Sequence, residues 1–352
     1  MPKRTRIVIG GVDTHGRTHH AAVLDEQGRL LGDREFPADR DGYRQLLGWL
    51  GRHGQVGVVG VEGTGSYGAG LAGYLGDQQV RVVEVDRPDR RIRRQRGRSD
   101  PIDAEAAARA VLAGTATAAP KRRDGIVEAI RVLRTARRGA SKARTAAINQ
   151  LKALLVTAPA PVREALDDLS MSALVTTCAR FRPDEAGLAD PAQASKAALQ
   201  AIARRIQLLE AEIDLADQRL ATLVGRAAPR LLGLLAIGKD HAGQLLITAG
   251  QHPERLRGEA AFAHLCGVAP IPASSGKTRR HRLHRGGDRD ANRALHLAVV
   301  VRMQFCPRTR AYVERRTKEG LSKPEIMRCI KRYLAREVYH ALVADFEALH
   351  AT

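Results

Sequence analysis

Short apolar runs separated by turn residues dominate the first 85 residues of the chain. Their lengths and β-branched residues predict strands, and 55–62 (QVGVVGVE) is apolar enough to be a buried central strand. Between two of these runs, Tyr43, Leu46 and Leu50 fall on one face of a predicted helix. The predicted strands are 5–13, 18–25, 29–36, 55–62 and 79–85, and the predicted helices are about 40–52 and 66–76. The pattern predicts an α/β domain with a mixed sheet flanked by helices.

From about residue 121 the periodicity becomes helical. A basic helix is predicted at about 124–156, with Arg137 and Arg138 on a basic, solvated face, and a stretch containing Pro and Asp (159–192) interrupts the pattern. The next helix carries apolar residues in alternating steps of three and four, which form a heptad seam. The seam consists of Leu199, Ile202, Ile206, Leu209, Ile213, Ala216, Leu220 and Leu223. It is compatible with an amphipathic helix of a bundle and with a coiled coil, formed within the chain or between subunits.

The last part of the chain predicts a second compact domain. Residues 235–250 have the character of a helix, a tight turn around Gly238 and a second helix, which resembles a phosphate-binding helix-hairpin-helix. A loop rich in Pro, Ser, Gly and basic residues follows at 270–288, and helices are predicted at about 289–305 and 323–349. The expected regions are an α/β domain at 1–120, a helical or coiled-coil region at 121–225 and a mainly helical domain at 226–352.

The chain of 352 residues has 58 Lys and Arg against 38 Asp and Glu, a formal net charge of +20. This charge predicts a polyanionic partner, and the hydrophobic share of 44% excludes a wholly disordered polycation. Aromatic residues make up only 3%, which argues against single-strand binding through rows of stacking rings. No apolar run reaches the roughly 20 residues that span a bilayer, and the N-terminus lacks a signal-peptide core. Since the four cysteines also lack metal or disulfide spacing, we expect a reduced, cytoplasmic protein that binds nucleic acid.

Four carboxylates stand where the predicted elements would bring them together. Asp13 and Glu62 end two apolar strands, at the rim of the sheet where open α/β folds place their ligands. Asp100, followed by Pro101, marks a helix start as its N-cap, and Asp103 lies near the same helix end. Together they would be hard oxygen ligands for Mg²⁺ or Mn²⁺, and two such ions support phosphodiester chemistry. Alternatively, the two helical acids cap a helix and offset its dipole, and the two strand-end acids are ordinary turn residues.

A second group of chemically active residues lies in the loop after residue 270. A serine hydroxyl, here Ser274 or Ser275, needs assistance to act as a nucleophile, and guanidinium forks suit a phosphorane-like transition state. Alternatively, the segment is a flexible basic loop that grips phosphates, and His281 and His284 are phosphate contacts. The basic candidates for nucleic-acid binding are Arg90, Arg91, Arg93, Arg94, Arg96 and Arg98 beside the acidic residues, and Lys277, Arg279, Arg280, Arg282 and Arg285 beside the serines.

These residues resemble the motifs of the DEDD-type transposases of the insertion-sequence family IS110, with IS116, which also includes a pilin-gene invertase. The motifs occur in order towards both ends of the chain, and 121–225 resembles the family least. They are GVDTHGRTHHAAVLD (11–25), VEGTGSYGAGLAGYL (61–75), VDRPDRRIRRQRGRSDPIDAEAAARAV (85–111), FAHLCGVAPIPASSGKTRRHRLHRGGDRDANRALHLA (262–298) and PRTRAYVERRTKEGLSKPEIMRCIKRYLARE (307–337). One departure is Gly16, where many relatives carry lysine; if that lysine contacts phosphate, Arg17 would substitute for it.

The resemblance implies a ribonuclease H-like, RuvC-like N-terminal domain with an acidic tetrad that binds Mg²⁺, or alternatively Mn²⁺. The tetrad maps to Asp13, Glu62, Asp100 and Asp103. It also implies a C-terminal transposase domain with a nucleophilic serine, which we map to Ser275, directly before Gly276, with Ser274 as the alternative. Members of the family are guided by a structured noncoding bridge RNA, one loop of which pairs with target DNA and another with donor DNA. They act as homo-oligomers, dimers or tetramers, in which the acidic site of one subunit meets the serine of another.

The leading hypothesis is therefore an RNA-guided transposase in the cytoplasm of a bacterium, associated with the nucleoid, that cuts and rejoins DNA strands. Two alternatives remain. A RuvC-like nuclease would use metal-activated water on branched DNA and would need the tetrad but not Ser275. An inactive transposon remnant would bind nucleic acid without cutting it.

Overall fold

The computed structural model describes residues 6–85, 97, 99–251, 256–277 and 280–351. Contacts within the chain separate two compact units. The first, called here the sheet unit, comprises Met1–Gly125 with Ala249–Arg257, and the second, the helical unit, comprises Ile126–Thr248 with Gly258–Thr352. The division into three regions at 120/121 and 225/226 stays a prediction.

Five strands form the sheet of the sheet unit, in the order β3-β2-β1-β4-β5. Their bounds are β1 Ile7–Thr14, β2 Thr18–Asp25, β3 Leu30–Pro37, β4 Gln55–Glu62 and β5 Val82–Val85. β2 pairs antiparallel with β1 and with β3, whereas β1, β4 and β5 run parallel to one another. The predicted mixed sheet is confirmed, and because three of its strands are parallel, their carboxyl ends meet at one edge.

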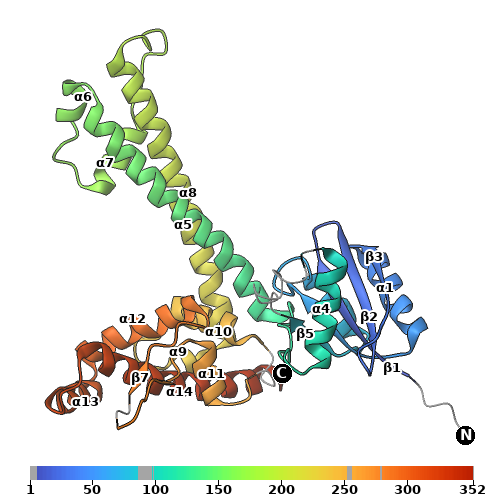
Figure 1. Ribbon diagram of the computed structural model, residues 1–352. Helices are drawn as coiled ribbons and strands as arrows, with labels where there is room; N and C mark the ends of the chain where they lie inside the picture. Colours follow the sequence, from blue (N-terminus) through green and yellow to red (C-terminus); the bar gives the residue numbers. More distant parts are fainter. Residues whose placement is uncertain (1–5, 86–96, 98, 252–255, 278–279, 352) are drawn as a thin grey trace, which may run out of the picture. The chain divides into compact units, whose positions relative to one another are not determined.

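Helices cover both faces of this sheet, because successive side chains of a strand point to opposite faces (Figure 1). Helices α1 (Arg40–His53) and α2 (Ala69–Asp77) pack into one core with Val8 of β1. Helix α4 (Asp100–Leu112) packs on the other face, where it contacts Ile9 of the same strand. The α/β character that the sequence predicts for this part of the chain is thus confirmed.

Two long antiparallel helices, α5 and α8, lie side by side in the helical unit, with the short α6 and α7 near one end (Figure 1). Their bounds are α5 Gly125–Thr157, α6 Ala160–Glu164, α7 Met171–Ala179 and α8 Pro191–Ala227. Ion pairs Arg137–Asp217 and Arg144–Glu210 join the two long helices, and their opposite numbering reflects the antiparallel direction. The interruption predicted at 159–192 contains α6 and α7.

The apolar seam predicted on α8 packs against α5 within the chain. Leu199 and Ile206 are fully buried, in a core that includes Leu151 of α5. Towards the end of α8 the buried positions shift, since Val224 is buried and Leu223 only partly so. The partner of the seam's first half is therefore a helix of the same chain, while its designation as a coiled coil stays a prediction.

The rest of the helical unit packs around its last helix, α14. The bounds are α9 Pro229–Leu232, α10 Lys239–Ala249, α11 Glu259–Leu265, β6 Ile271–Pro272, β7 His281–Arg282, α12 Arg289–Phe305, α13 Pro307–Lys318 and α14 Lys323–His350. Phe262 of α11 and Phe346 of α14 are fully buried. The buried carboxylate of Asp345 accepts hydrogen bonds from the N–H groups of Arg230 and Leu231, both at 3.0 Å, and so satisfies the start of α9.

One prediction for this region is wrong in part, and one helix was missed. Residues 235–238 lie outside any helix and α9 before them has only four residues, so the predicted helix-hairpin-helix around Gly238 lacks a full first helix. Helix α13 was not predicted, because it buries no side chain and therefore lacks the apolar stripe that signals a helix. Among the residues that the structure describes, no helix is long and apolar enough to cross a membrane.

Candidate functional site

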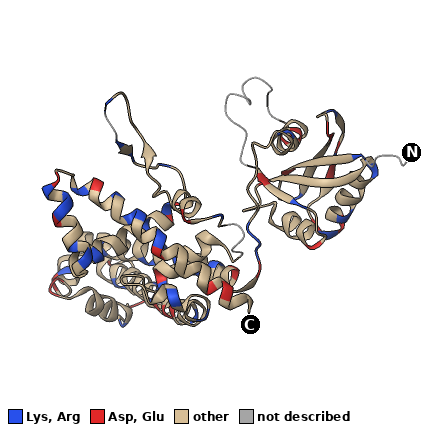
Figure 2. Ribbon diagram, turned by 90° about the horizontal axis from the view of Figure 1, so that it is seen from below, with Lys and Arg blue, Asp and Glu red and all other residues tan. Residues whose placement is uncertain are grey.

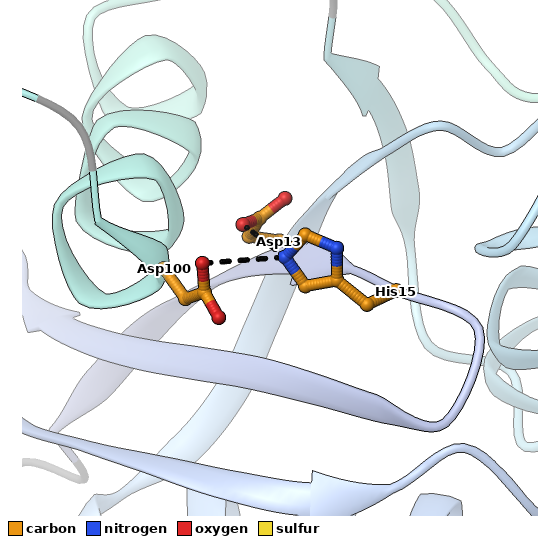
Figure 3. Close-up of side chains that lie close together, drawn as sticks. All are labelled: Asp13, His15 and Asp100. Carbon is orange, nitrogen blue, oxygen red and sulfur yellow. Dashed lines mark hydrogen bonds and ion pairs between the residues drawn. The ribbon is translucent and has the colours of Figure 1, made fainter.

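The side chains of Asp13, His15 and Asp100 meet at the edge of the sheet where the parallel strands end (Figure 3). His15 Nε2 lies 3.1 Å from Asp13 Oδ2 and 3.3 Å from Asp100 Oδ1. Across the described part of the chain, this is the group whose donor atoms all lie within 4.8 Å of one another. Two carboxylates and an imidazole at this separation can share one divalent ion.

The direct packing of α4 on β1 brings Asp100 to Asp13. A Cβ atom on Gly11 of β1 would lie 2.2 Å from the carbonyl oxygen of Ala104 in α4, closer than any real contact. Glycine at this position therefore lets the helix backbone rest on the strand. The helix start then lies beside the strand end, and the acidic residues of both elements share one edge of the sheet.

Asp100 is the first residue of α4, and Ser99 is the N-cap, so the prediction that Asp100 caps the helix is wrong. Pro101 does not separate the two assignments, because proline is tolerated throughout the first turn, where N–H groups have no helical partner. The Asp100 carboxylate reaches His15 instead (Figure 3). This contact favours participation in the acidic cluster over simple helix capping.

Burial and neighbouring carboxylates raise the pKa of Asp13 above its ordinary value. Burial is the largest cause, Asp103 and Asp100 add to the increase, and the nearby His15 opposes it. Asp103 is itself only 5% exposed and lies close enough for its charge to act on Asp13. Because these carboxylates repel one another, a bound cation would stabilise the ionised cluster.

Glu62 ends β4, the parallel neighbour of β1, at the same edge of the sheet. The pairing of the two strands runs up to Val12 and Val61, and the Thr14 hydroxyl donates a hydrogen bond to the backbone oxygen of Glu62 at 2.8 Å. Within the described residues, neither Glu62 nor Asp103 belongs to the group of donor atoms within 4.8 Å. The structure thus places all four predicted acids at one edge and brings two of them, with His15, within range of a shared ion.

Sequence reasoning missed His15. The signal was present, because residues i and i+2 of an extended chain point to the same side, and Asp13 and His15 have this spacing. The histidine also follows directly on β1, where a side chain can turn back over the strand end.

Ser274 and Ser275 lie in the exposed hairpin between β6 and β7, which projects from the helices of its unit (Figure 2). The Ser274 hydroxyl accepts a hydrogen bond from the N–H of Arg280 at 3.3 Å and donates one to its carbonyl oxygen at 3.5 Å. The Ser275 hydroxyl has no hydrogen-bond partner among the described residues. Gly276 follows with φ +55°, a left-handed conformation that turns the chain at the tip. Ser274 therefore holds the hairpin together, whereas Ser275 is exposed with an unbonded hydroxyl in the described part of the hairpin.

The predicted nucleic-acid-binding residues fall into two groups. Arg90, Arg91, Arg93, Arg94, Arg96, Arg98 and Arg279 lie outside the described residues. Lys277, Arg280, Arg282 and Arg285 are exposed in the hairpin and the segment that follows it. His281 is exposed, and His284 is half-buried with its ring 5.2 Å from that of His264. The described basic residues are thus available to a phosphate backbone.

The basic face predicted on α5 makes ion pairs within the helical unit. Arg137 pairs with Asp217 of α8, and Arg138 pairs with Asp290 of α12. Part of the charge of this helix is therefore neutralised by its neighbours, and it is less available to nucleic acid than the hairpin.

Two family models match the chain. Residues 10–158 match the DEDD transposase model of IS110, and residues 228–314 match the model of the transposase IS116/IS110/IS902 family. The first match contains the acidic edge of the sheet, and the second contains the serine hairpin. A search of curated proteins finds no match.

Proposed function

Since this chain belongs to the IS110/IS116 family of transposases, enzymes that act on DNA, we propose that it cuts and rejoins DNA strands with an acidic metal site and a serine nucleophile. The acidic site consists of Asp13, Glu62, Asp100 and Asp103, with His15 beside them. The nucleophile is Ser275, on the hairpin of the helical unit.

The sheet unit supports a ribonuclease H-like, RuvC-like fold. Three strands in antiparallel sequence are followed by two parallel strands, and helices lie on both faces. The acidic residues stand at the ends of β1 and β4 and at the start of α4, where such a sheet exposes its carboxyl edge.

The DEDD family match indicates that the enzyme depends on a divalent metal, and the residues present fit one. Asp13, Asp100 and His15 offer donor atoms within reach of a single ion, and the charge of Asp103 acts on Asp13. Glu62 ends the neighbouring parallel strand at the same edge. We propose Mg²⁺, with Mn²⁺ as the alternative because manganese accepts an imidazole nitrogen more readily. A metal bound here would supply positive charge to a phosphate oxygen.

Ser275 acts on the phosphodiester that is cut. Its hydroxyl oxygen attacks the phosphorus, the bond from phosphorus to the sugar oxygen of the leaving strand breaks, and the serine proton passes to that oxygen. A sugar hydroxyl of the second strand then attacks the same phosphorus, and Ser275 leaves with its proton restored. The guanidinium groups of Arg280 and Arg282 bind the phosphate oxygens as charge develops on them.

The contrast between the two serine hydroxyls is the observation that carries this proposal. Ser274 is bonded on both sides to the backbone of Arg280, whereas Ser275 stands exposed beside a left-handed glycine. A nucleophile must reach a substrate, and only the second serine is free of a competing bond within the described hairpin.

DNA is the substrate of this family, and we propose that a structured bridge RNA selects the donor and target sequences. The net charge of +20 supplies contacts to phosphates, which position a nucleic acid but do not read its sequence. An aromatic content of 3% fits a protein that leaves this reading to base pairing. The enzyme works as a homo-oligomer, a dimer or tetramer, in the bacterial cytoplasm at the nucleoid.

The test is strand transfer between donor and target plasmids in cells that also transcribe the noncoding region flanking the gene, which supplies the proposed bridge RNA. Ser275→Ala should abolish recombinants and the covalent protein–DNA band that survives denaturant. Ser274→Ala is the matched control, since it removes a neighbouring hydroxyl from the same hairpin, and it should retain the covalent band.

Other outcomes identify the alternatives. Cleavage without a covalent band, unchanged in Ser275→Ala, would point to a nuclease that uses metal-activated water. No cleavage by the parent protein with any flanking RNA would point to an inactive remnant that only binds nucleic acid.

A further inference from the structure

A cavity of about 600 Å³ lies at the base of the hairpin that carries Ser275. Residues 267–270, which lead into the hairpin, form one wall, and 280–284, which leave it, form another. The end of α13, the turn after it and the first part of α14 form the third side, with lining residues that fall between 316 and 333. A space of this size accepts a small organic ligand.

Positive charge dominates the lining of this cavity. Six basic side chains face two carboxylates, those of Glu319 and Glu325. The basic residues are Arg280, Arg282, Arg316, Arg328, Lys331 and Arg332. Three of them have carboxylate partners: Arg316 pairs with Glu319, Arg328 with Glu325 at 4.0 Å, and Arg332 with Glu259 at 3.4 Å. The excess of positive charge over these pairs calls for an anion.

Lys331 is the most informative of these residues, because it is a buried cation without a carboxylate partner in the described structure. It is 7% exposed, and its ammonium donates to the neutral Oδ1 of Asn292 at 3.0 Å. Burial, and secondly the charge of Arg328, lower the pKa of Lys331. An ammonium has three donors, so a buried one with a single neutral acceptor lacks compensation that a phosphate oxygen would provide.

Two residues that line the cavity also carry buried nitrogens without a hydrogen-bond partner in the described part of the chain. Arg316 Nε and His284 Nδ1 are buried and form no hydrogen bond with any described residue. Buried polar groups in folded proteins are generally satisfied, but neither atom is accessible to solvent, so a ligand in the cavity would not contact them directly.

The cavity also offers apolar surface. Leu321 and Tyr333 line it from the α13–α14 side, and Leu283 lines it from the side of the hairpin. A tyrosine ring can stack on a nucleobase, and aliphatic side chains can pack against a sugar. Cations beside an aromatic ring match the two halves of a nucleotide.

We propose that this cavity binds one nucleotide of the DNA strand cut at Ser275, with its phosphate on Lys331 and Arg282 and its base against Tyr333. The inference rests on the proposed serine chemistry for the identity of the strand. Asn292 links the cavity to the hairpin. Its side-chain oxygen accepts from Lys331, and its amide group donates to the carbonyl oxygens of Cys266 and Gly267 at 3.1 and 2.8 Å, just before the hairpin. Occupancy of the cavity would therefore hold the base of the hairpin and orient Ser275.

The test measures binding to the full chain by isothermal titration calorimetry at low salt. The probes are the dinucleotide thymidylyl-deoxyadenosine, with one phosphodiester, its ribose counterpart uridylyl-adenosine, and inorganic phosphate. The DNA dinucleotide should bind more tightly than phosphate and at least as tightly as the ribose form. Lys331→Met and Arg282→Gln should each weaken its binding about tenfold, the loss expected for one charge-assisted hydrogen bond.

Two control variants separate the outcomes. Lys318→Met removes an exposed charge from α13 outside the cavity and should bind like the parent. Ser275→Ala should also bind like the parent, so a failure of the serine mechanism leaves this result intact. Because Lys331 is buried, circular dichroism checks the fold of its variant. If Lys331→Met unfolds, dinucleotide binding by Arg282→Gln, at an exposed position, tests the proposal instead.

Several results would overturn the proposal. They are unchanged dinucleotide binding in folded Lys331→Met or in Arg282→Gln, an equal loss in Lys318→Met, and no binding by the parent. Phosphate binding as tight as the dinucleotide would reduce the cavity to a simple anion site, and tighter ribose binding would assign it to RNA instead.

Discussion

Asp13 is buried and lies close to other carboxylates, and both conditions disfavour its ionised form. Its pKa is raised by burial and by Asp103 and Asp100, so the ionised form costs folding free energy at neutral pH. A divalent ion would relieve that cost. We therefore expect Mn²⁺ or Mg²⁺ to raise the melting temperature of the parent protein. At a metal concentration a hundredfold above Kd, binding should increase the free energy of unfolding by about 2.7 kcal/mol.

Asp13→Asn should remove this metal effect while leaving the metal-free protein at least as stable as the parent at pH 7. The sign follows from the raised pKa, since the cost of the charge is present above the folded-state pKa and absent below the unfolded value of 3.8. Asp77→Asn, at the exposed end of α2, is the control and should keep the metal effect. Equal metal stabilisation of Asp13→Asn and parent would contradict the site.

Asp25 presents the opposite case, a buried carboxylate whose ionised form is favoured. Burial opposes ionisation, but hydrogen bonds from the backbone and side chain of Arg29 and from the N–H of Gln27 hold the pKa of Asp25 below its ordinary value of 3.8. This stabilisation is present above that value and is lost as the pH falls through the lower, folded-state pKa.

Asp25→Asn should accordingly lower the free energy of unfolding at pH 7, and its difference from the parent should shrink below about pH 3.8. Urea denaturation at a series of pH values measures both. A difference that stays constant down to the acid limit would show that the hydrogen bonds, rather than the charge, carry the effect.

At the scale of elements, the contact between β1 and α4 assembles the acidic edge. Gly11→Ala would place a Cβ 2.2 Å from Ala104 O and must push the helix away from the strand. We expect a loss of about 1–3 kcal/mol in stability, as for overpacked cores, together with loss of metal stabilisation and of strand transfer.

Gly48→Ala is the matched control for this change. Gly48 lies on the exposed side of α1, and a Cβ there meets nothing within 4 Å. Alanine should stabilise the helix by up to about 1 kcal/mol and leave activity unchanged. Thermal denaturation and plasmid recombination of the two variants check the pair, and equal activity of both would refute the role assigned to the β1–α4 contact.

At the scale of the whole molecule, the two proposed sites belong to different compact units. The acidic edge lies in the sheet unit and the serine hairpin in the helical unit. If the acidic site of one subunit meets the serine of another, two inactive variants can complement each other. A mixture of Asp13→Asn and Ser275→Ala chains should recover strand transfer that neither chain shows alone.

The recovered activity should stay below that of the parent, because only some mixed assemblies pair an intact acidic site with an intact serine. Mixing each variant with a second preparation of itself is the control. No recovery at any ratio would place both sites in the same subunit.

The chain's hydrophobic pattern by itself determined most of the fold. Period-two and period-3.6 patterns identify five strands and the long helices, because burial of one face imposes that periodicity locally. The acidic and serine motifs were equally visible. The pattern failed at α13, which buries no side chain, and before Gly238, where apolar residues occupy turns.

Only the tertiary structure decided which of these residues meet. The periodic apolar seam predicts that one face of α8 is buried but does not identify the element that covers it. The contact with Leu151 of α5 depends on a chain reversal about 50 residues long. Asp100 joins Asp13 and His15 only because Gly11 lets α4 rest on β1. Likewise, the sequence alone does not distinguish the adjacent Ser274 and Ser275. They differ in the fold because only Ser274 forms hydrogen bonds with the backbone of Arg280. The sequence determines which reactive side chains are present and which local elements carry them, whereas contacts between distant residues depend on how those elements pack.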